Sequence, residues 1–123
     1  MLEKYNNHIE NNIYDISKAF AIRVVRLYNY LTDEKQEYIL SKQLLRSGTS
    51  IGANVFEGKN AQSRADFSSK MNIALKEATE SEYWLDLLHE THYINDTEFE
   101  PISNDSNKII AVLTKIVKAT NNK

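Results

Sequence analysis

Hydrophobic residues recur at helical spacing in four separate stretches of the chain. In the first stretch they are three or four positions apart, as one face of an α-helix requires, at Ile13, Ile16, Phe20, Val24, Leu27 and Leu31. This spacing predicts a helix over residues 12–31, with Asn12 as its N-cap. A second apolar row beside the first makes the apolar sector wider than one core requires, at Tyr14, Ala21, Val25 and Tyr28.

The second stretch predicts a helix over residues 34–58. Asp33 and Gln36 have the spacing of a capping box and mark its start. Its inner seam alternates steps of four and three, which is typical of helices packed side by side, at Leu40, Leu44, Ser47, Ile51 and Asn54. Gly58 suits its C-terminal end, because glycine readily takes the left-handed cap conformation.

The third and fourth stretches complete the pattern. Ser63 and Asp66 form another capping-box pair, which opens a helix over residues 63–93. The seam of that helix is the most regular in the chain, at Phe67, Met71, Ala74, Ala78, Ser81, Leu85, Leu88 and His92. A polar loop then closes at Pro101, which cannot continue a preceding helix, and the last helix is predicted over residues 103–120.

Four amphipathic helices joined by short connections predict one all-α domain over residues 1–123, folded as an antiparallel up-down four-helix bundle. The wide apolar sectors of the first and last helices predict that this domain also buries a face against other copies of itself. The alternative is that these residues only thicken the core of one bundle.

A polar segment interrupts the second helix. Gly48 and Gly52 are each unfavourable in a helix interior by about 1 kcal/mol relative to alanine. Antiparallel pairing with the third helix would gather a half-buried polar network, composed of Arg46, Ser50, Asn54, Glu57, Glu77 and Glu80. Buried polar groups must be hydrogen-bonded, and such a network can fix the register between helices. The other interpretations are a ligand or ion site and a solvated face.

Composition narrows the class of protein. The 123 residues carry a formal net charge of -2, whereas a dedicated nucleic-acid binder usually has a basic excess. There is no cysteine, so disulfides and thiolate metal sites are excluded. No apolar run is long enough for a membrane span or a signal peptide, and the expected location is therefore the cytoplasm.

Motifs that carry chemistry are missing. A di-iron bundle needs two Glu-x-x-His motifs on different helices, and the chain offers only Asp86-Leu87-Leu88-His89, with His92 nearby. No nucleophile elbow, Walker A loop or dinucleotide-binding glycine motif is present. The sequence therefore predicts a protein that is not an enzyme and that uses no metal or other cofactor.

Basic residues lie at one-turn spacing on the first and last helices. They are the candidate contacts to nucleic acid, namely Lys18, Arg23, Arg26, Lys108, Lys115 and Lys118. Tyr28 and Tyr30 lie near the first group and could stack on bases, although they suit a core or a subunit interface equally well. The alternative for the lysines and arginines is solubility and compensation of helix dipoles.

Residues 15–90 resemble the four-helix-bundle family encoded by intervening sequences of bacterial 23S ribosomal RNA genes. The most specific part is Arg46-Ser47-x-x-Ser50-Ile51-x-Ala53-Asn54-x-x-Glu57-Gly58. Further matching segments are Ala65-Asp66-Phe67 and Glu82-x-Trp84-Leu85. The resemblance implies a homopentameric ring and an association with ribosomal RNA.

A related branch of that family serves as the accessory protein of diversity-generating retroelements, where it binds nucleic acid and a reverse transcriptase through a basic surface. The net charge of -2 is a departure from that branch. Two hypotheses follow. The first is a non-catalytic oligomeric scaffold whose partner is RNA or a protein, and the second is a nucleic-acid-binding accessory factor.

Overall fold

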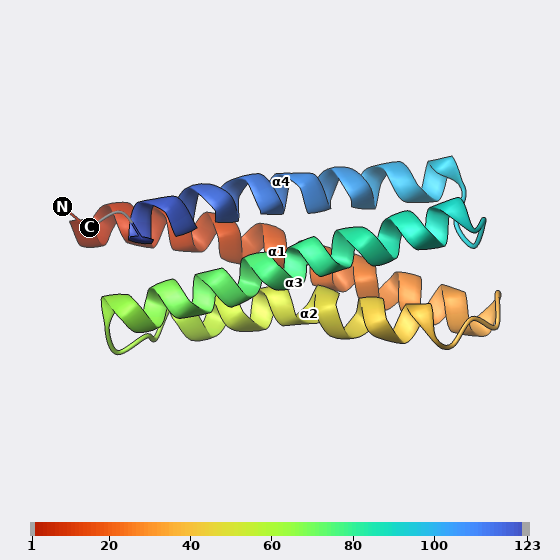
Figure 1. Ribbon diagram of the computed structural model, residues 1–123, viewed down its shortest axis with the longest axis horizontal. Coiled ribbons are helices and arrows are strands. Elements are labelled where there is room, and N and C mark those ends of the chain that lie inside the picture. The colour runs from red at the N-terminus through yellow and green to blue at the C-terminus, as the bar shows by residue number, and fades with distance from the viewer. Residues whose placement is uncertain (1, 122–123) are drawn as a thin grey trace.

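The structure is a computed structural model that describes the backbone of residues 2–121 and the side chains of residues 12–121. Four helices follow one another along the chain, and their bounds are α1 Leu2–Asp33, α2 Leu40–Gly58, α3 Arg64–Glu90 and α4 Asp96–Asn121. Consecutive helices are antiparallel, so the two described ends lie together at the end that carries the α2–α3 connection (Figure 1). The predicted all-α up-down arrangement is confirmed.

Each helix packs against its two neighbours around the bundle, and α1 and α4 approach each other least closely. Most of the core consists of apolar positions that the helical spacing indicated, but in α2 Val55 is fully buried whereas Asn54, predicted on the inner seam, is half-buried. Ile13, Phe20, Val24 and Leu31 of α1 are completely buried, and so are Met71 and Leu88 of α3. None of the described helices is both long enough and apolar enough to cross a membrane.

The first helix begins at Leu2 and not at 12, so Asn12 lies inside α1 and is not its N-cap. The start of α2 also differs from the prediction, because α2 begins at Leu40 and not at 34. Asp33 is the last residue of α1, and Gln36 has a positive φ of 55°, so the proposed capping box does not form. Glu37 performs the capping instead. Its carboxylate accepts hydrogen bonds from the backbone N–H groups of Ile39, Leu40 and Ser41, at 3.1, 2.9 and 2.7 Å.

Glu37 is almost fully buried, at 7% relative exposure. Burial alone raises the pKa of its carboxyl, but hydrogen bonds from Leu40, Ser41 and Ile39 outweigh that effect and hold the pKa below its ordinary value. A charged carboxylate at the N-terminal end of α2 is also favoured by the helix dipole. Glu37 therefore orders the connection between α1 and α2 through its side chain and also through its backbone N–H, which donates to the carbonyl of Leu31 at 2.9 Å.

The start of α4 was also predicted wrongly, since α4 begins at Asp96 and not at 103. Asn95 and Glu98 cap it reciprocally: the Glu98 N–H donates to Asn95 Oδ1 and the Asn95 N–H donates to Glu98 Oε1, both at 2.8 Å. Pro101 lies inside the helix. There it removes only the hydrogen bond to the carbonyl of Thr97, which is a small loss for a helix of 26 residues.

At α3 the predicted N-cap is confirmed, because Ser63 Oγ accepts a hydrogen bond from the Asp66 N–H at 3.0 Å. The helix ends at Glu90, before the predicted end at 93, and His92 takes a positive φ of 70°. His92 is consequently exposed and does not extend the apolar seam of α3.

Candidate interaction surfaces

The six polar residues expected to form one network divide into three groups. Arg46 of α2 binds Glu77 and Glu80 of α3; the distance from Arg46 Nη1 to Glu77 Oε1 is 3.2 Å. Trp84 Nε1 also donates to Glu80, at 2.9 Å. The hydrogen bond from Arg46, strengthened by that from Trp84, lowers the pKa of the Glu80 carboxyl.

The other three residues have different partners. Ser50 Oγ donates to the carbonyl of Arg46 at 2.7 Å, and Asn54 Nδ2 donates to the carbonyl of Ser50 at 2.9 Å, both within α2. Glu57 pairs with Lys70 of α3 at 2.9 Å, and this contact raises the pKa of Lys70. Half of the Arg46 side chain is exposed, so the ion cluster is a surface clamp between α2 and α3.

A buried polar contact that the sequence did not single out lies beneath this clamp. Ser47 Oγ and Ser81 Oγ are 2.8 Å apart in the core between α2 and α3, and Ser81 also donates to the carbonyl of Glu77. The signal in the sequence was a serine at an inner seam position of each helix. Small hydroxyl groups meeting there let α2 lie close to α3 while both remain hydrogen-bonded.

The six basic residues proposed for nucleic acid do not form one patch. Lys18 lines a groove together with residues of α2, and its Nζ donates to the hydroxyl of Tyr14 of α1 at 3.5 Å. Arg23 points toward α4, where its Nε lies 3.1 Å from Asp105 Oδ2. The remaining four are exposed and form no ion pair within residues 12–121, namely Arg26, Lys108, Lys115 and Lys118.

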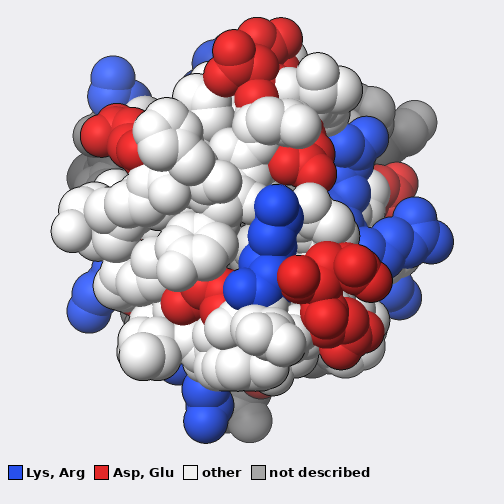
Figure 2. Space-filling view, turned by 90° about the vertical axis from the view of Figure 1, so that its right-hand side faces the viewer, with Lys and Arg blue, Asp and Glu red and all other residues white. Residues whose placement is uncertain are grey.

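The Arg23–Asp105 contact shows which faces of α1 and α4 meet. Arg26 is three residues after Arg23, and Lys108 is three residues after Asp105, so each lies one turn along the same side of its helix. Because α1 and α4 run in opposite directions (Figure 1), Arg26 and Lys108 lie on opposite sides of the Arg23–Asp105 pair along the seam between the two helices. By contrast, acidic and basic side chains alternate with uncharged ones on the end that carries the α1–α2 and α3–α4 connections (Figure 2).

A groove of about 300 Å³ lies on the outer side of α1 and α2. It is lined by Tyr14, Lys18, Ala21, Thr49, Gly52, Ala53 and Phe56. The rings of Tyr14 and Phe56 are 5.8 Å apart, and the Phe56 side chain is half exposed. Lys18 and Lys59 both lie over the Tyr14 ring, with Nζ at 5.8 and 4.9 Å from its centroid. The groove is thus apolar inside and positively charged at its rim.

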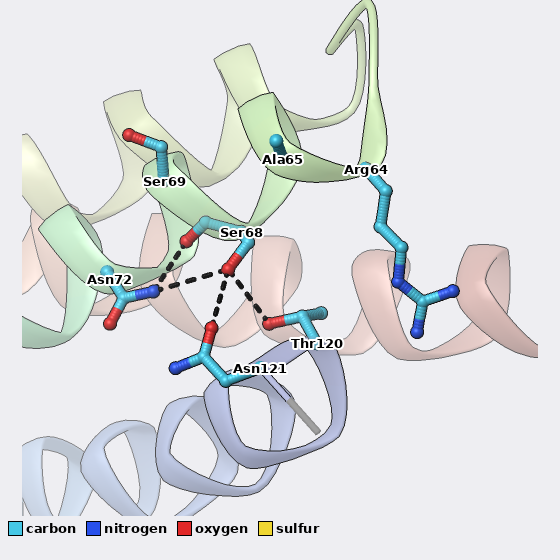
Figure 3. Close-up of a pocket in the computed structure, with 7 residues that line it drawn as sticks. All are labelled: Arg64, Ala65, Ser68, Ser69, Asn72, Thr120 and Asn121. Carbon is cyan, nitrogen blue, oxygen red and sulfur yellow. Dashed lines mark hydrogen bonds between the residues drawn. The ribbon is translucent and has the colours of Figure 1, made fainter. Parts of the chain in front are cut away.

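A polar pocket of about 500 Å³ lies between α3 and α4 near their ends at the α2–α3 connection. Figure 3 shows the hydroxyl of Ser68 at its centre: it donates to Asn121 Oδ1 at 2.8 Å and accepts from Thr120 at 3.3 Å. Asn72 Nδ2 donates to the Ser68 carbonyl at 2.8 Å. Ser68, Asn72, Thr120 and Asn121 thus satisfy one another, while the Arg64 side chain at the edge of the pocket is exposed.

The candidate metal ligands are also separated. His89 Nε2 lies 2.6 Å from Asp96 Oδ1, and the His89 ring stacks on Phe99 with centroids 4.0 Å apart. His89 therefore joins the end of α3 to the start of α4. Across the described residues, no group of three or more His, Asp and Glu side chains is arranged to hold a metal ion.

Comparisons with known proteins agree with this architecture. The model of a family described as the 23S rRNA-intervening sequence protein matches residues 10–115. A crystal structure of a protein of unknown function from the S23 ribosomal protein family, from Bacteroides thetaiotaomicron, superposes with a TM-score of 0.87. The two chains are 55% identical, and the match covers 89% of this chain and 98% of the other. Comparison with curated proteins found no match.

Proposed function

Because the chain belongs to the 23S rRNA-intervening sequence protein family, we propose that it is a non-catalytic interaction protein that assembles with copies of itself. The observation that carries the proposal is an apolar surface on α1, α2 and their connection. Ile22, Val25, Tyr38, Ile39 and Phe56 are all exposed there. Large apolar side chains that are exposed in this number on one side of a protein mark a site of protein–protein contact.

The number of copies that we propose is five, closed into a ring in the cytoplasm. The number comes from the family resemblance, and the apolar surface supports assembly without specifying a symmetry. The decisive measurement is the mass of the protein in solution by light scattering and native mass spectrometry, across a range of concentrations. A mass of one chain at every concentration would refute self-assembly, and a stable assembly of another size would refute the ring of five.

We further propose that the assembly associates with ribosomal RNA. The support is the name of the family and the basic seam between α1 and α4, where Arg26 and Lys108 are exposed. A ring would repeat this seam once per copy and so concentrate positive charge that a single chain with a net charge of -2 lacks. A second candidate is an accessory factor that binds the nucleic acid of a reverse-transcriptase complex, and the same seam favours it.

Retardation of a 23S ribosomal RNA fragment in a gel, repeated at increasing salt, tests the association with RNA. Arg26→Glu combined with Lys108→Glu should weaken binding and lower the slope of log affinity against log salt by about 1.5. Lys42→Glu is the matched control, because Lys42 is an exposed lysine of α2 away from the seam. Absence of retardation at low salt would refute RNA binding, and equal retardation of unrelated single-stranded DNA would favour the accessory factor.

A further inference from the structure

The exposed apolar side chains of this surface fall into two places. One is the groove between α1 and α2, where Phe56 is 53% exposed. The other is the connection over residues 33–39, where Tyr38 is 59% and Ile39 73% exposed. Ile22 and Val25 lie on α1 between them. The groove is in the half of the helix pair nearer the α2–α3 connection, and the 33–39 connection is at the opposite end (Figure 1).

The two places have opposite charge. Lys18 and Lys59 stand at the rim of the groove over the Tyr14 ring, and within residues 12–121 neither of them pairs with a carboxylate. Asp33 and Glu34 are exposed beside the apolar pair of the connection, and they too form no ion pair there. Lys35 is exposed beside them, with its Nζ 5.9 Å from the centroid of the Tyr30 ring, so two carboxylates and one lysine leave the exposed part of the connection with a net negative charge. Tyr38 and Ile39, with carboxylates beside them, are therefore complementary to the apolar groove with its lysines.

The connection is also held in one shape. Three backbone N–H groups are bound to the buried carboxylate of Glu37, and one of them belongs to Ile39. The side chains of Tyr38 and Ile39 project from a backbone that needs no further ordering on contact. Preorganisation of this kind favours binding, because less conformational freedom is lost.

We propose that the 33–39 connection of one copy docks in the α1–α2 groove of a second copy. This inference rests on the proposed self-assembly and names its contact. Tyr38 and Ile39 enter the groove beside Phe56, while Asp33 and Glu34 approach Lys18 and Lys59. Because the groove and the connection lie at opposite ends of the same helix pair, every copy can give one contact and receive one, and such head-to-tail contacts form a ring when the rotation between copies closes.

The chemistry of the groove favours this occupant over RNA. Its volume of about 300 Å³ is at the lower limit of small-ligand pockets and suits one or two inserted side chains. Its lining is mainly apolar, with two alanines and a glycine. The ring of Tyr14, which could stack on a base, already contacts two lysine side chains and Phe56.

The test uses matched pairs of variants of the full chain, with assembly followed by sedimentation across concentrations. Tyr38→Ser with Ile39→Ser should weaken assembly by about 30-fold or more, as removal of interface anchors does. Lys18→Glu with Lys59→Glu should also weaken it, and adding Asp33→Lys with Glu34→Lys to that variant should restore it. Tyr83→Ser is the control, because Tyr83 is equally exposed, at 59%, but lies on α3. Far-UV circular dichroism verifies that each variant folds.

The outcomes separate the two proposals. If the unaltered protein is a single chain in solution, the proposed self-assembly fails and this contact fails with it. If the protein assembles and the groove and connection variants assemble equally well, the contact is refuted and the proposed function stands. If only one of the two sites matters, or if the groove variant retains assembly and loses RNA retardation, the docking of the connection in the groove is likewise refuted.

Discussion

Two glycines of α2 provide a sharp test of the packing, because they lie one turn apart and should respond oppositely to alanine. A Cβ at Gly48 would lie 2.8 and 2.9 Å from the two methyl groups of Val24. Val24 is completely buried and β-branched, so rotation cannot move both methyls away. A Cβ at Gly52 would meet Ser17 at 3.5 Å or more, which is ordinary contact.

The magnitudes follow from two opposing effects. Alanine is favoured over glycine in a helix by about 1 kcal/mol, whereas an extra methyl in a tight core costs about 1–3 kcal/mol. Gly48→Ala should therefore lower the free energy of unfolding by about 1 kcal/mol, after the gain in propensity offsets part of the overpacking. Gly52→Ala should raise it by about 1 kcal/mol. The two variants should differ by about 8 °C in Tm.

The assay is thermal and denaturant unfolding followed by far-UV circular dichroism. Several protein concentrations are needed, since Gly52 lines the groove and assembly would add to apparent stability. Val24→Ala should be less damaging in the Gly48→Ala background than alone, because the new methyl occupies part of the vacated space. Equal gains from both glycine replacements would refute the assignment of Gly48 as the residue that sets the distance between α1 and α2.

Three other substitutions address polar groups. Glu37→Gln should destabilise the fold by about 1–2 kcal/mol at neutral pH. The folded state holds the pKa of Glu37 below its ordinary value of 4.5. The stabilisation from the Glu37 carboxylate is therefore present above pH 4.5 and is lost as the pH falls through the lowered pKa. Denaturant unfolding from about pH 7 to about pH 3 should show that the difference in unfolding free energy between the unaltered protein and Glu37→Gln becomes smaller. Ser47→Ala should cost about 1–2 kcal/mol by leaving Ser81 with one partner fewer, and less when Ser81→Ala accompanies it, as a double-mutant cycle would report. Ser106→Ala should be neutral or stabilising by up to about 1 kcal/mol, because the Ser106 Oγ is buried without a hydrogen-bond partner in the described part of the chain; a clear loss in Tm would contradict that.

The helical bundle could be predicted because burial in it follows spacing alone. Ile13, Phe20 and Val24 recur every three to seven positions, and all three are completely buried. The inner face of a helix can be identified even when the ends of the helix are predicted wrongly, because many residues define that face together. The order of the helices followed from the short connections between them.

The helix starts were harder to predict because each depends on one or two side chains. Glu37 caps α2 from a position outside the helix, which no short capping motif anticipates. Asn95 and Glu98 did carry a capping signal, but Pro101 favoured a later start of α4. A proline near the beginning of a long helix removes one hydrogen bond, and packing of Ile102 and Ile109 in the core offsets that loss.

The predicted polar network of six residues forms only in part, from Arg46, Glu77 and Glu80. Arg46, Glu77 and Glu80 do meet, since antiparallel pairing of α2 and α3 places them together. Ser50 and Asn54 bind backbone carbonyls of their own helix, which spacing alone cannot distinguish from contacts between helices. The groove between α1 and α2 was not anticipated, because it depends on where two helices leave space outside the core.

Because α1 and α2 lie close together, the residues of α2 fall into two rows, one that faces the core and one that faces the groove. Gly48 and Ser47 face inward and set the spacing of the helices, whereas Thr49, Ala53 and Phe56 face outward into the groove. Side chains in the outer row can be exchanged without altering the spacing that the inner row defines. Substitutions in the outer row of α2 can therefore change what the groove binds while the packing of the bundle stays the same.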